Sequence, residues 1–135
     1  AHLDANAIAR PVELRVGEDA RIEIELVNAG GGPAQLAMVE SVIPPGFEVV
    51  SKPERCRIEE NSVNLRGRKL DPLESDVVSL VIRPLAKGNF TFTPRILYID
   101  ESGKHKTVGS KQITLTVKEL SVAGWLKGPE KRPSG

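Results

Sequence analysis

The strictest pattern in this chain is an alternation of apolar and charged residues over residues 20–29. Its apolar members are Ile22, Ile24 and Leu26, and charged residues stand between them. A period of two is typical of a β-strand that turns one face to a core and the other to water. The segment therefore predicts a half-buried strand, with the flanking segments as its partners.

Short apolar segments separated by Gly, Pro and Asp repeat this design along the chain. Further strands are expected within residues 1–10, 12–16, 35–42, 48–51, 63–70, 76–83, 90–99 and 111–118, the first two forming one split strand. Turn signals recur at intervals of about 8–12 residues, as they do in β-sandwiches. The sequence thus predicts an all-β, immunoglobulin-like β-sandwich of about seven or eight antiparallel strands with Greek-key connections.

The same alternation predicts which side chains face the core. They are Leu3, Ile8, Val12, Leu14, Val16, Val63, Leu65, Phe90, Phe92, Ile113, Leu115 and Val117. For residues 35–42 the pattern does not decide which face is buried, because Leu36 with Met38 and Ala37 with Val39 satisfy it equally well.

Residues 76–83 are apolar on both faces of the expected strand. Val78 and Leu80 lie on one side, and Val77 and Val81 lie on the other. Apolar residues on both faces favour a central strand that is covered on both sides.

Two turns contain residues with restricted or unusual backbone conformations. Pro44 and Pro45 fix φ in a stiff turn, and Gly46 supplies a conformation that other residues resist. Residues 100–104 have the chemistry of a hairpin turn, with Gly103 expected at positive φ.

The composition excludes several classes of function. Lys and Arg total 19 against 18 Asp and Glu, so the net charge of +1 creates no long-range field for nucleic acid or an anionic membrane. Aromatic residues make up 4%, too few for platforms on which bases stack. No apolar run approaches the roughly 18 residues that span a bilayer, so membrane contact is not expected. Cys56 is the only cysteine, which excludes an internal disulfide and favours an inert thiol that anchors its loop.

The composition changes after Glu119, where the chain becomes rich in Gly, Pro and Lys. This change predicts a domain over residues 1–119 and a flexible C-terminal tail or linker over residues 120–135. Trp125 and Leu126 are apolar residues of this tail with basic neighbours. They either dock to a neighbouring domain or fold back over an open end of the sandwich.

Five segments carry a resemblance to a known group: VGEDARIEIELVNAGGGPA, VIPPGFEVV, KLDPLESDVVSLVIRP, KGNFTFTPRILYIDESGK and QITLTV. Together they resemble prokaryotic immunoglobulin-like modules of the CARDB and BatD type, over about residues 12–117. The resemblance implies a non-enzymatic module of a larger archaeal or bacterial protein, one that docks, adheres or spaces domains. It favours the cell surface or another location outside the cytoplasm.

No arrangement of residues typical of catalysis is found in the sequence. His2 and His105 are the only histidines, and no HExxH, GxSxG, Walker or GxGxxG pattern occurs. Catalysis would need a nucleophile beside a base, paired carboxylates or a metal cluster. We therefore expect no enzyme activity, no cofactor and no catalytic residue.

Two acidic groups offer the oxygen ligands that calcium prefers. One comprises Asp71, Glu74 and Asp76, and the other comprises Asp100 and Glu101. Neither follows an ordered calcium-loop pattern, and turn formation explains these residues more simply. The sequence therefore predicts no metal site.

Three hypotheses for the function remain. The first is a module that binds a partner protein or a neighbouring domain through its loops, or spaces domains. The second is a regulatory or accessory domain of a multidomain or membrane-bound enzyme, and the third is a calcium-dependent adhesion module. Under the first hypothesis the expected interaction residues are Gly31, Gly32, Pro33, Pro44, Pro45, Phe47, Trp125 and Leu126. Pairing of the edge strands with a second copy stays open.

Overall fold

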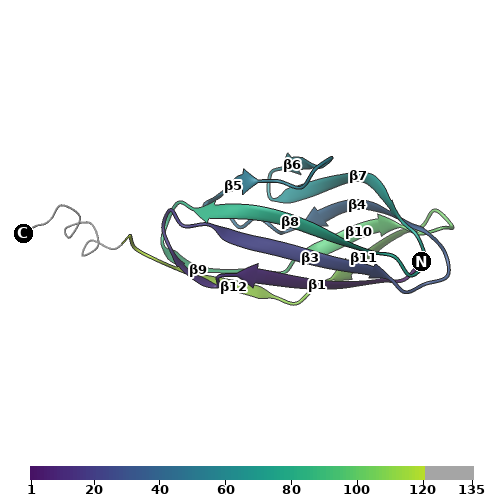
Figure 1. Ribbon diagram of the computed structural model, residues 1–135, viewed down its shortest axis with the longest axis horizontal. Coiled ribbons are helices and arrows are strands. Elements are labelled where there is room, and N and C mark those ends of the chain that lie inside the picture. The colour runs from purple at the N-terminus through teal and green to yellow at the C-terminus, as the bar shows by residue number, and fades with distance from the viewer. Residues whose placement is uncertain (121–135) are drawn as a thin grey trace, which may run out of the picture.

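A computed structural model describes residues 1–120 of the chain. This part consists of strands and turns arranged in two elongated layers (Figure 1). The strands are β1 (Leu3–Arg10), β2 (Glu13–Arg15), β3 (Ala20–Asn28), β4 (Ala34–Glu40), β5 (Phe47–Ser51), β6 (Arg57–Glu59), β7 (Ser62–Leu70), β8 (Ser75–Pro84), β9 (Gly88–Phe92), β10 (Arg95–Ile99), β11 (His105–Gly109) and β12 (Ile113–Lys118). The predicted all-β sandwich is confirmed.

One layer has the strand order β1-β3-β8-β5, and the other contains the orders β11-β10-β4-β7-β6 and β2-β12-β9. The last two sets form one layer because β9 leads into β10, and β11 into β12, across short breaks. The backbone N–H of Ser110 bridges these breaks by donating to the carbonyl of Pro94 over 3.0 Å. After β3 the chain crosses to the second layer for β4, returns for β5, crosses again for β6 and β7, and comes back as β8, which inserts between β3 and β5 in a Greek-key connection.

The strand count and one strand direction differ from the expectation. The structure has twelve strands because breaks at Pro11 and Pro94 divide longer strands, because the short β6 precedes β7, and because the hairpin after β10 adds β11, which the sequence did not predict. In addition, β2 runs parallel to β12, so the sandwich is not wholly antiparallel. This pairing lets the second half of the split first strand change layers, as the different partners of β1 and β2 show.

The core lies between the layers and is built around β3. Its residues Ile22, Ile24 and Leu26 are fully buried, as predicted. Ile22 pairs with Leu80 of β8, and Ile24 pairs with Val78, so two aliphatic strands meet in register. Each such side chain contributes about 1.5–3 kcal/mol on burial.

The first strand faces the core with small residues, which corrects the expectation for Ile8. Leu3 is buried as predicted, but Ile8 is only half-buried and lies on the opposite face. Alternation from Leu3 places Ala5 and Ala7 inward, and both pack against the core. Val12 is also not buried: it is 51% exposed, in the link between β1 and β2.

A bulge settles the face of β4 that the sequence left open. Leu36 and Val39 are both fully buried, although they belong to different alternation sets. In the pairing of β4 with β10, Leu36 and Met38 lie opposite the adjacent residues Tyr98 and Leu97, so β4 has one extra residue there and its inward face moves by one residue. Each of the two expected faces is therefore half correct.

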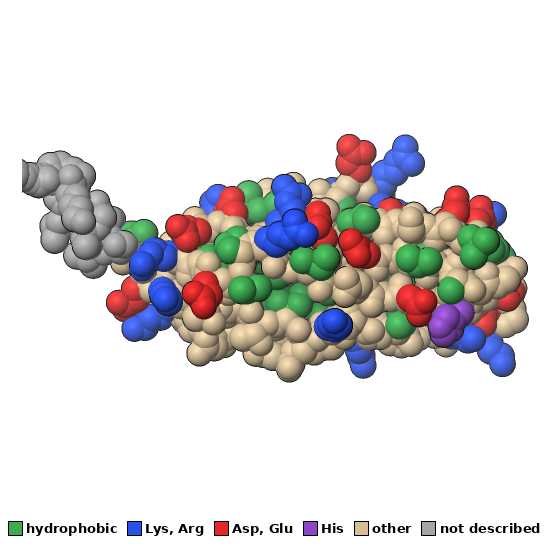
Figure 2. Space-filling model, turned by 60° about the horizontal axis from the view of Figure 1, so that its bottom comes forward, with side chains coloured by type: hydrophobic (Ala, Val, Ile, Leu, Met, Phe, Trp, Pro, Cys, Tyr) green, Lys and Arg blue, Asp and Glu red, His purple; other side chains and the backbone are tan. Residues whose placement is uncertain are grey.

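The strand β8 is central, as predicted, but it is covered on one side only. Val78 and Leu80 are buried, whereas Val77 is 49% exposed on the outer face. Hydrophobic side chains scattered among acidic and basic ones are visible on the face drawn in Figure 2. The expectation of cover on both sides was wrong because this layer has no third layer outside it among the described residues.

The predicted tail lies almost wholly beyond the described part of the chain. Trp125 and Leu126 are outside it, and the division between residues 1–119 and 120–135 stays a prediction. In residues 1–120 no helix is long and apolar enough to cross a membrane.

Candidate functional site

The turn with two prolines borders an open groove where the second layer splits. The strand β4 pairs with β10 as far as Glu40 and Arg95. Beyond that pair the chain of β4 crosses to the other layer, while β9 stays with β12. The gap is a groove of about 450 Å³, which we call the proline groove, lined by Ser41, Ile43, Pro44, Pro45, Asn61, Thr91, Phe92, Thr93 and Arg95.

The proline groove combines an apolar floor with polar groups that are held in place. Pro44 is buried and Pro45 is exposed, so the two predicted interaction residues have different surroundings. The carbonyl of Asn61 accepts hydrogen bonds from the backbone N–H groups of residues 42 and 43 over 3.1 and 3.2 Å. Arg95 donates to the Glu40 carboxylate over 2.9 Å. The groove is therefore formed by fixed segments.

One side of the groove is the open edge of β9. Its only paired strand among the described residues is β12. The N–H of Thr116 in β12 donates to the carbonyl of Val12, on the side of β2. Peptide groups alternate in direction along a strand, so those of the neighbouring residue Leu115 point to β9 and pair with those of Phe90. By the same alternation the peptide groups of Thr91 point away from β12 and toward the groove. This edge has free donors and acceptors of the kind that bind an added strand.

Phe47, the third residue predicted near this turn, does not line the groove. Its ring packs edge to face against Phe90, with centroids 4.9 Å apart and an interplanar angle of 88°. Phe47 lies on β5 and Phe90 on β9, so the pair joins the two layers. Gly46 precedes it with φ of +84°, the conformation expected for this turn.

The glycine-rich loop between β3 and β4 lies at the end of the sandwich that is far from β9 and β12 (Figure 1). Gly31 and Pro33 are exposed, whereas Gly32 is buried. A Cβ atom at Gly32 would overlap the end of the Glu101 side chain, whereas one at Gly30 would overlap the backbone of Ala1 and His2, so the close approach that needs glycine is at Gly30. A hollow of about 320 Å³ next to the loop is lined by Pro33, Gln35, Lys69, Ile99, Asp100, Glu101 and Gly103.

A buried asparagine holds this end together, and the sequence reasoning missed it. Asn28 is fully buried and continues the inward face of β3. Its Nδ2 donates to the carbonyls of Gly32 and Leu70 over 2.8 and 3.0 Å. Its Oδ1 accepts from the N–H groups of His2 and Gly30 over 3.2 and 3.0 Å. Extending the alternation of β3 by two residues would have identified a polar side chain in the core.

The hairpin between β10 and β11 is organised by one carboxylate. Asp100 is 7% exposed, and its Oδ1 accepts hydrogen bonds from the hydroxyl and N–H of Ser102 and the N–H of Lys104. These bonds hold the pKa of Asp100 well below its ordinary value, with the Ser102 hydroxyl as the largest cause. Gly103 has φ of +83°, as predicted for this turn.

The other acidic residues weighed as calcium ligands are engaged locally. Asp71 lies 3.4 Å from Lys69, and Asp76 accepts from Arg68 over 2.8 Å. Glu74 accepts the N–H of Asp71 over 2.7 Å, which closes a turn. Within residues 1–120, no three acidic, His or Cys side chains gather in a way that could hold a metal ion.

Comparison with protein-family models and with curated proteins finds no match. Solved structures match at low identity. The major pilin subunit BcpA of Bacillus cereus matches with a TM-score of 0.64 at 9% identity over 87% of this chain, which spans 41% of that chain. A CARDB domain from Pyrococcus furiosus, in complex with di-metal ions, matches with a TM-score of 0.57 at 16% sequence identity, over 89% of this chain and 94% of that chain. The VesB protease of Vibrio cholerae matches with a TM-score of 0.57 at 14% sequence identity, over 84% of this chain and 31% of that chain.

These identities are all too low to show more than the fold. They agree with the immunoglobulin-like sandwich, and the CARDB domain is one of several sandwich types that match. The resemblance to CARDB modules is therefore supported for the fold and not as a specific assignment.

Proposed function

We propose that this chain is a non-catalytic module that binds an extended segment of a partner protein in the proline groove. The observation that carries the proposal is the open edge of β9 beside a groove of peptide size. Proteins commonly bind extended peptides by adding them as a strand to such an edge. The low-identity relatives include a pilin subunit and a CARDB domain, which agrees with a role in protein interaction.

The groove determines what kind of segment it accepts. The peptide groups of Asn89 and Thr91 supply backbone hydrogen bonds, which give affinity without a particular sequence. Successive side chains of an added strand point to opposite faces, so every second one enters the groove. There Pro45 and Phe92 favour a small apolar side chain, while Asn61 and Arg95 favour a polar one beside it.

The proposal is tested first in the free protein by amide hydrogen exchange. The N–H of Thr91 faces the groove, and we expect it to exchange faster than the N–H of Phe90, which faces β12. Equal protection of both amides would show that the edge is closed.

A substitution that removes one donor then tests binding. Peptides are selected from a displayed library of random decapeptides against the wild-type protein and measured against two variants. Thr91→Pro removes the N–H at an edge position, where proline is tolerated. Thr91→Val keeps the N–H and removes only the hydroxyl, which lies 3.1 Å from the hydroxyl of Thr114. We expect binding to fall about tenfold, or about 1.4 kcal/mol, in Thr91→Pro and to persist in Thr91→Val. Equal binding by both variants would refute strand addition.

A second candidate is an accessory domain of a larger enzyme. The similarity to a part of the VesB protease chain favours it. Deletion of residues 1–119 from the full-length protein separates the two functions, because an accessory domain that regulates catalysis changes the enzymatic rate when it is lost. A pure binding module leaves that rate unchanged.

A further inference from the structure

A third hollow, lined by residues of a different kind from those of the proline groove, lies beside β7. It has a volume of about 460 Å³ and is lined by Arg55, Leu65, Arg66, Arg68 and Lys69, which we call the arginine hollow. Leu65 is 1% exposed and forms its floor, and the other four residues carry positive charge. The arginine hollow shares no residue with the proline groove, so a ligand bound there is independent of the proposed function.

A wide bulge in β7 forms one wall of the arginine hollow. Leu36 of β4 pairs with Arg68, and Met38 pairs with Asn64, so one residue of β4 faces three of β7. The additional length is taken up where Arg66 and Gly67 adopt φ of +58° and +71°. The N–H of Arg66 donates to Oδ1 of Asn64 over 2.8 Å, which fixes the bulge. The side chain of Arg66 is exposed as a result.

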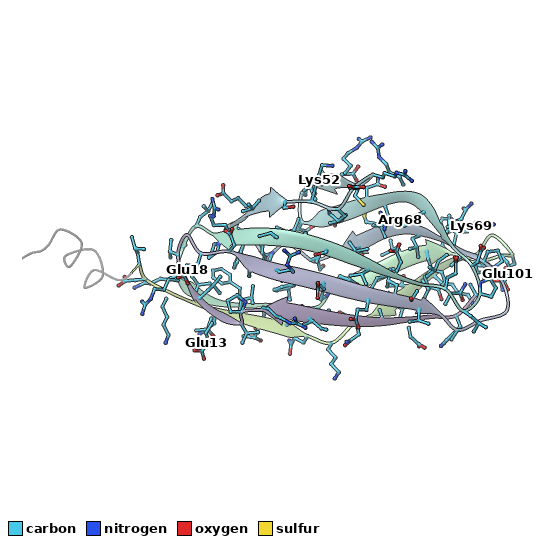
Figure 3. The ribbon with its side chains drawn as sticks, viewed as in Figure 1. Glu13, Glu18, Lys52, Arg68, Lys69 and Glu101 are labelled. Carbon is cyan, nitrogen blue, oxygen red and sulfur yellow. The ribbon has the colours of Figure 1, made fainter. Side chains whose placement is uncertain are left out.

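The loop before β6 forms the other wall, and Arg68 positions it. The Arg68 guanidinium donates to the carbonyl of Glu54 over 3.1 Å and to Asp76 over 2.8 Å, and it lies 3.5 Å from the buried Sγ of Cys56. Lys52 donates to the Cys56 carbonyl over 3.0 Å. Figure 3 shows Lys52 and Arg68 along the same edge of the sandwich. The loop is thus tied to Arg68 of β7 on both sides of Arg55, through Glu54 and Cys56.

The charges of the arginine hollow are only partly balanced. Arg68 and Lys69 have carboxylate partners in Asp76 and Asp71. Within residues 1–120, no carboxylate lies within 4.0 Å of Arg55 or Arg66. Both arginines also have positive φ, which is unfavourable for residues other than glycine. Among the described residues, the fold therefore holds two guanidinium groups without a carboxylate partner beside Leu65.

We propose that the arginine hollow binds an acidic segment of a partner protein through Asp or Glu carboxylates. Guanidinium groups pair with carboxylates in a planar, two-bond geometry. Phosphate-rich nucleic acid is the less suitable occupant, because no aromatic ring lines the hollow to stack on a base. The partner is thus recognised by the local positive charge of Arg55 and Arg66.

The test uses three labelled probes: an octapeptide of Asp and Glu, the corresponding octapeptide of Asn and Gln, and an eight-nucleotide thymidine oligomer. Binding to the intact chain is measured by fluorescence anisotropy at about 0.01 M ionic strength, where the Debye length is about 30 Å. The double variant Arg55→Gln, Arg66→Gln removes the two unpaired charges. The double variant Lys104→Gln, Lys111→Gln is the control, since it changes the net charge equally at exposed positions outside the hollow.

We expect the acidic peptide to bind the wild-type protein, with amide shifts concentrated in residues 65–69, and the neutral peptide to bind at least about tenfold more weakly. The arginine variant is expected to lose at least about tenfold in affinity for the acidic peptide, and the control to stay within about twofold. Absence of binding, or an equal loss in both variants, would overturn the proposal. Tighter binding of the oligonucleotide that depends on Arg55 and Arg66 would overturn it in favour of a nucleic-acid site.

Discussion

The substitution Asn28→Ala tests how the glycine-rich end of the sandwich is held. The side chain of Asn28 makes four hydrogen bonds, and no part of it is exposed. The bonds to the carbonyls of Gly32 and Leu70 are buried, so truncation leaves two acceptors without a partner, at about 1–2 kcal/mol each. The bonds from His2 and Gly30 are partly buried, so water replaces them in part and each costs about 0.5 kcal/mol.

The sum predicts that Asn28→Ala lowers the free energy of unfolding by about 4 kcal/mol. For a domain of this size that loss corresponds to a fall in melting temperature of roughly 15 °C. Urea unfolding followed by circular dichroism measures the first quantity, and calorimetry measures the second. Asn6→Ala, at an exposed asparagine of β1, is the matched control and is expected to change stability by less than about 0.5 kcal/mol.

A second variant separates hydrogen bonding from packing. Asn28→Asp conserves the shape but replaces the amide donor with a carboxylate that faces the carbonyls of Gly32 and Leu70. It is expected to destabilise at least as much as Asn28→Ala, because one oxygen of the buried carboxylate then faces two carbonyl oxygens with no proton between them. If Asn28→Asp were mild, or if Asn28→Ala stayed within about 1 kcal/mol of the wild type, the reasoning would be refuted.

Two further predictions concern the same end of the molecule. Gly30→Ala is expected to lower the free energy of unfolding by about 1–3 kcal/mol, because its Cβ would lie 2.5 Å from the backbone of the N-terminal segment. Gly31→Ala is the control and should be nearly neutral, because a Cβ there has open space. Equal melting temperatures of the two variants would contradict this prediction. The pKa of Asp100 is lower in the folded than in the unfolded protein, so its hydrogen bonds from Ser102 and Lys104 stabilise the fold above about pH 4 and lose this effect as the pH falls further. Urea midpoints between about pH 7 and pH 2 should therefore fall less steeply in Asp100→Asn, and parallel profiles would count against the assignment.

Local patterns in the sequence were sufficient for the fold class. The alternation of β3 and β12 depends only on the period of an extended chain, so it identified the strands and their buried faces correctly. Turn chemistry likewise identified Gly46 and Gly103 at positive φ, because glycine adopts this conformation without a steric cost.

The errors came where distant segments decide the outcome. The bulge that buries both Leu36 and Val39 depends on the register between β4 and β10. The exposure of Val77 depends on the absence of a covering layer over β8 among the described residues. Neither feature leaves a signal in the local pattern, because alternation does not report which strand or layer lies opposite.

The same division applies to the candidate sites. The sequence by itself determined a β-sandwich, the stiff turn at Pro44 and Pro45, and the lack of a catalytic motif. Only the tertiary structure placed Thr91 opposite that turn and gathered Arg55 and Arg66 around one hollow. The reason is physical: backbone preferences act between near neighbours in the chain, whereas grooves and charge clusters form from residues that only packing brings together.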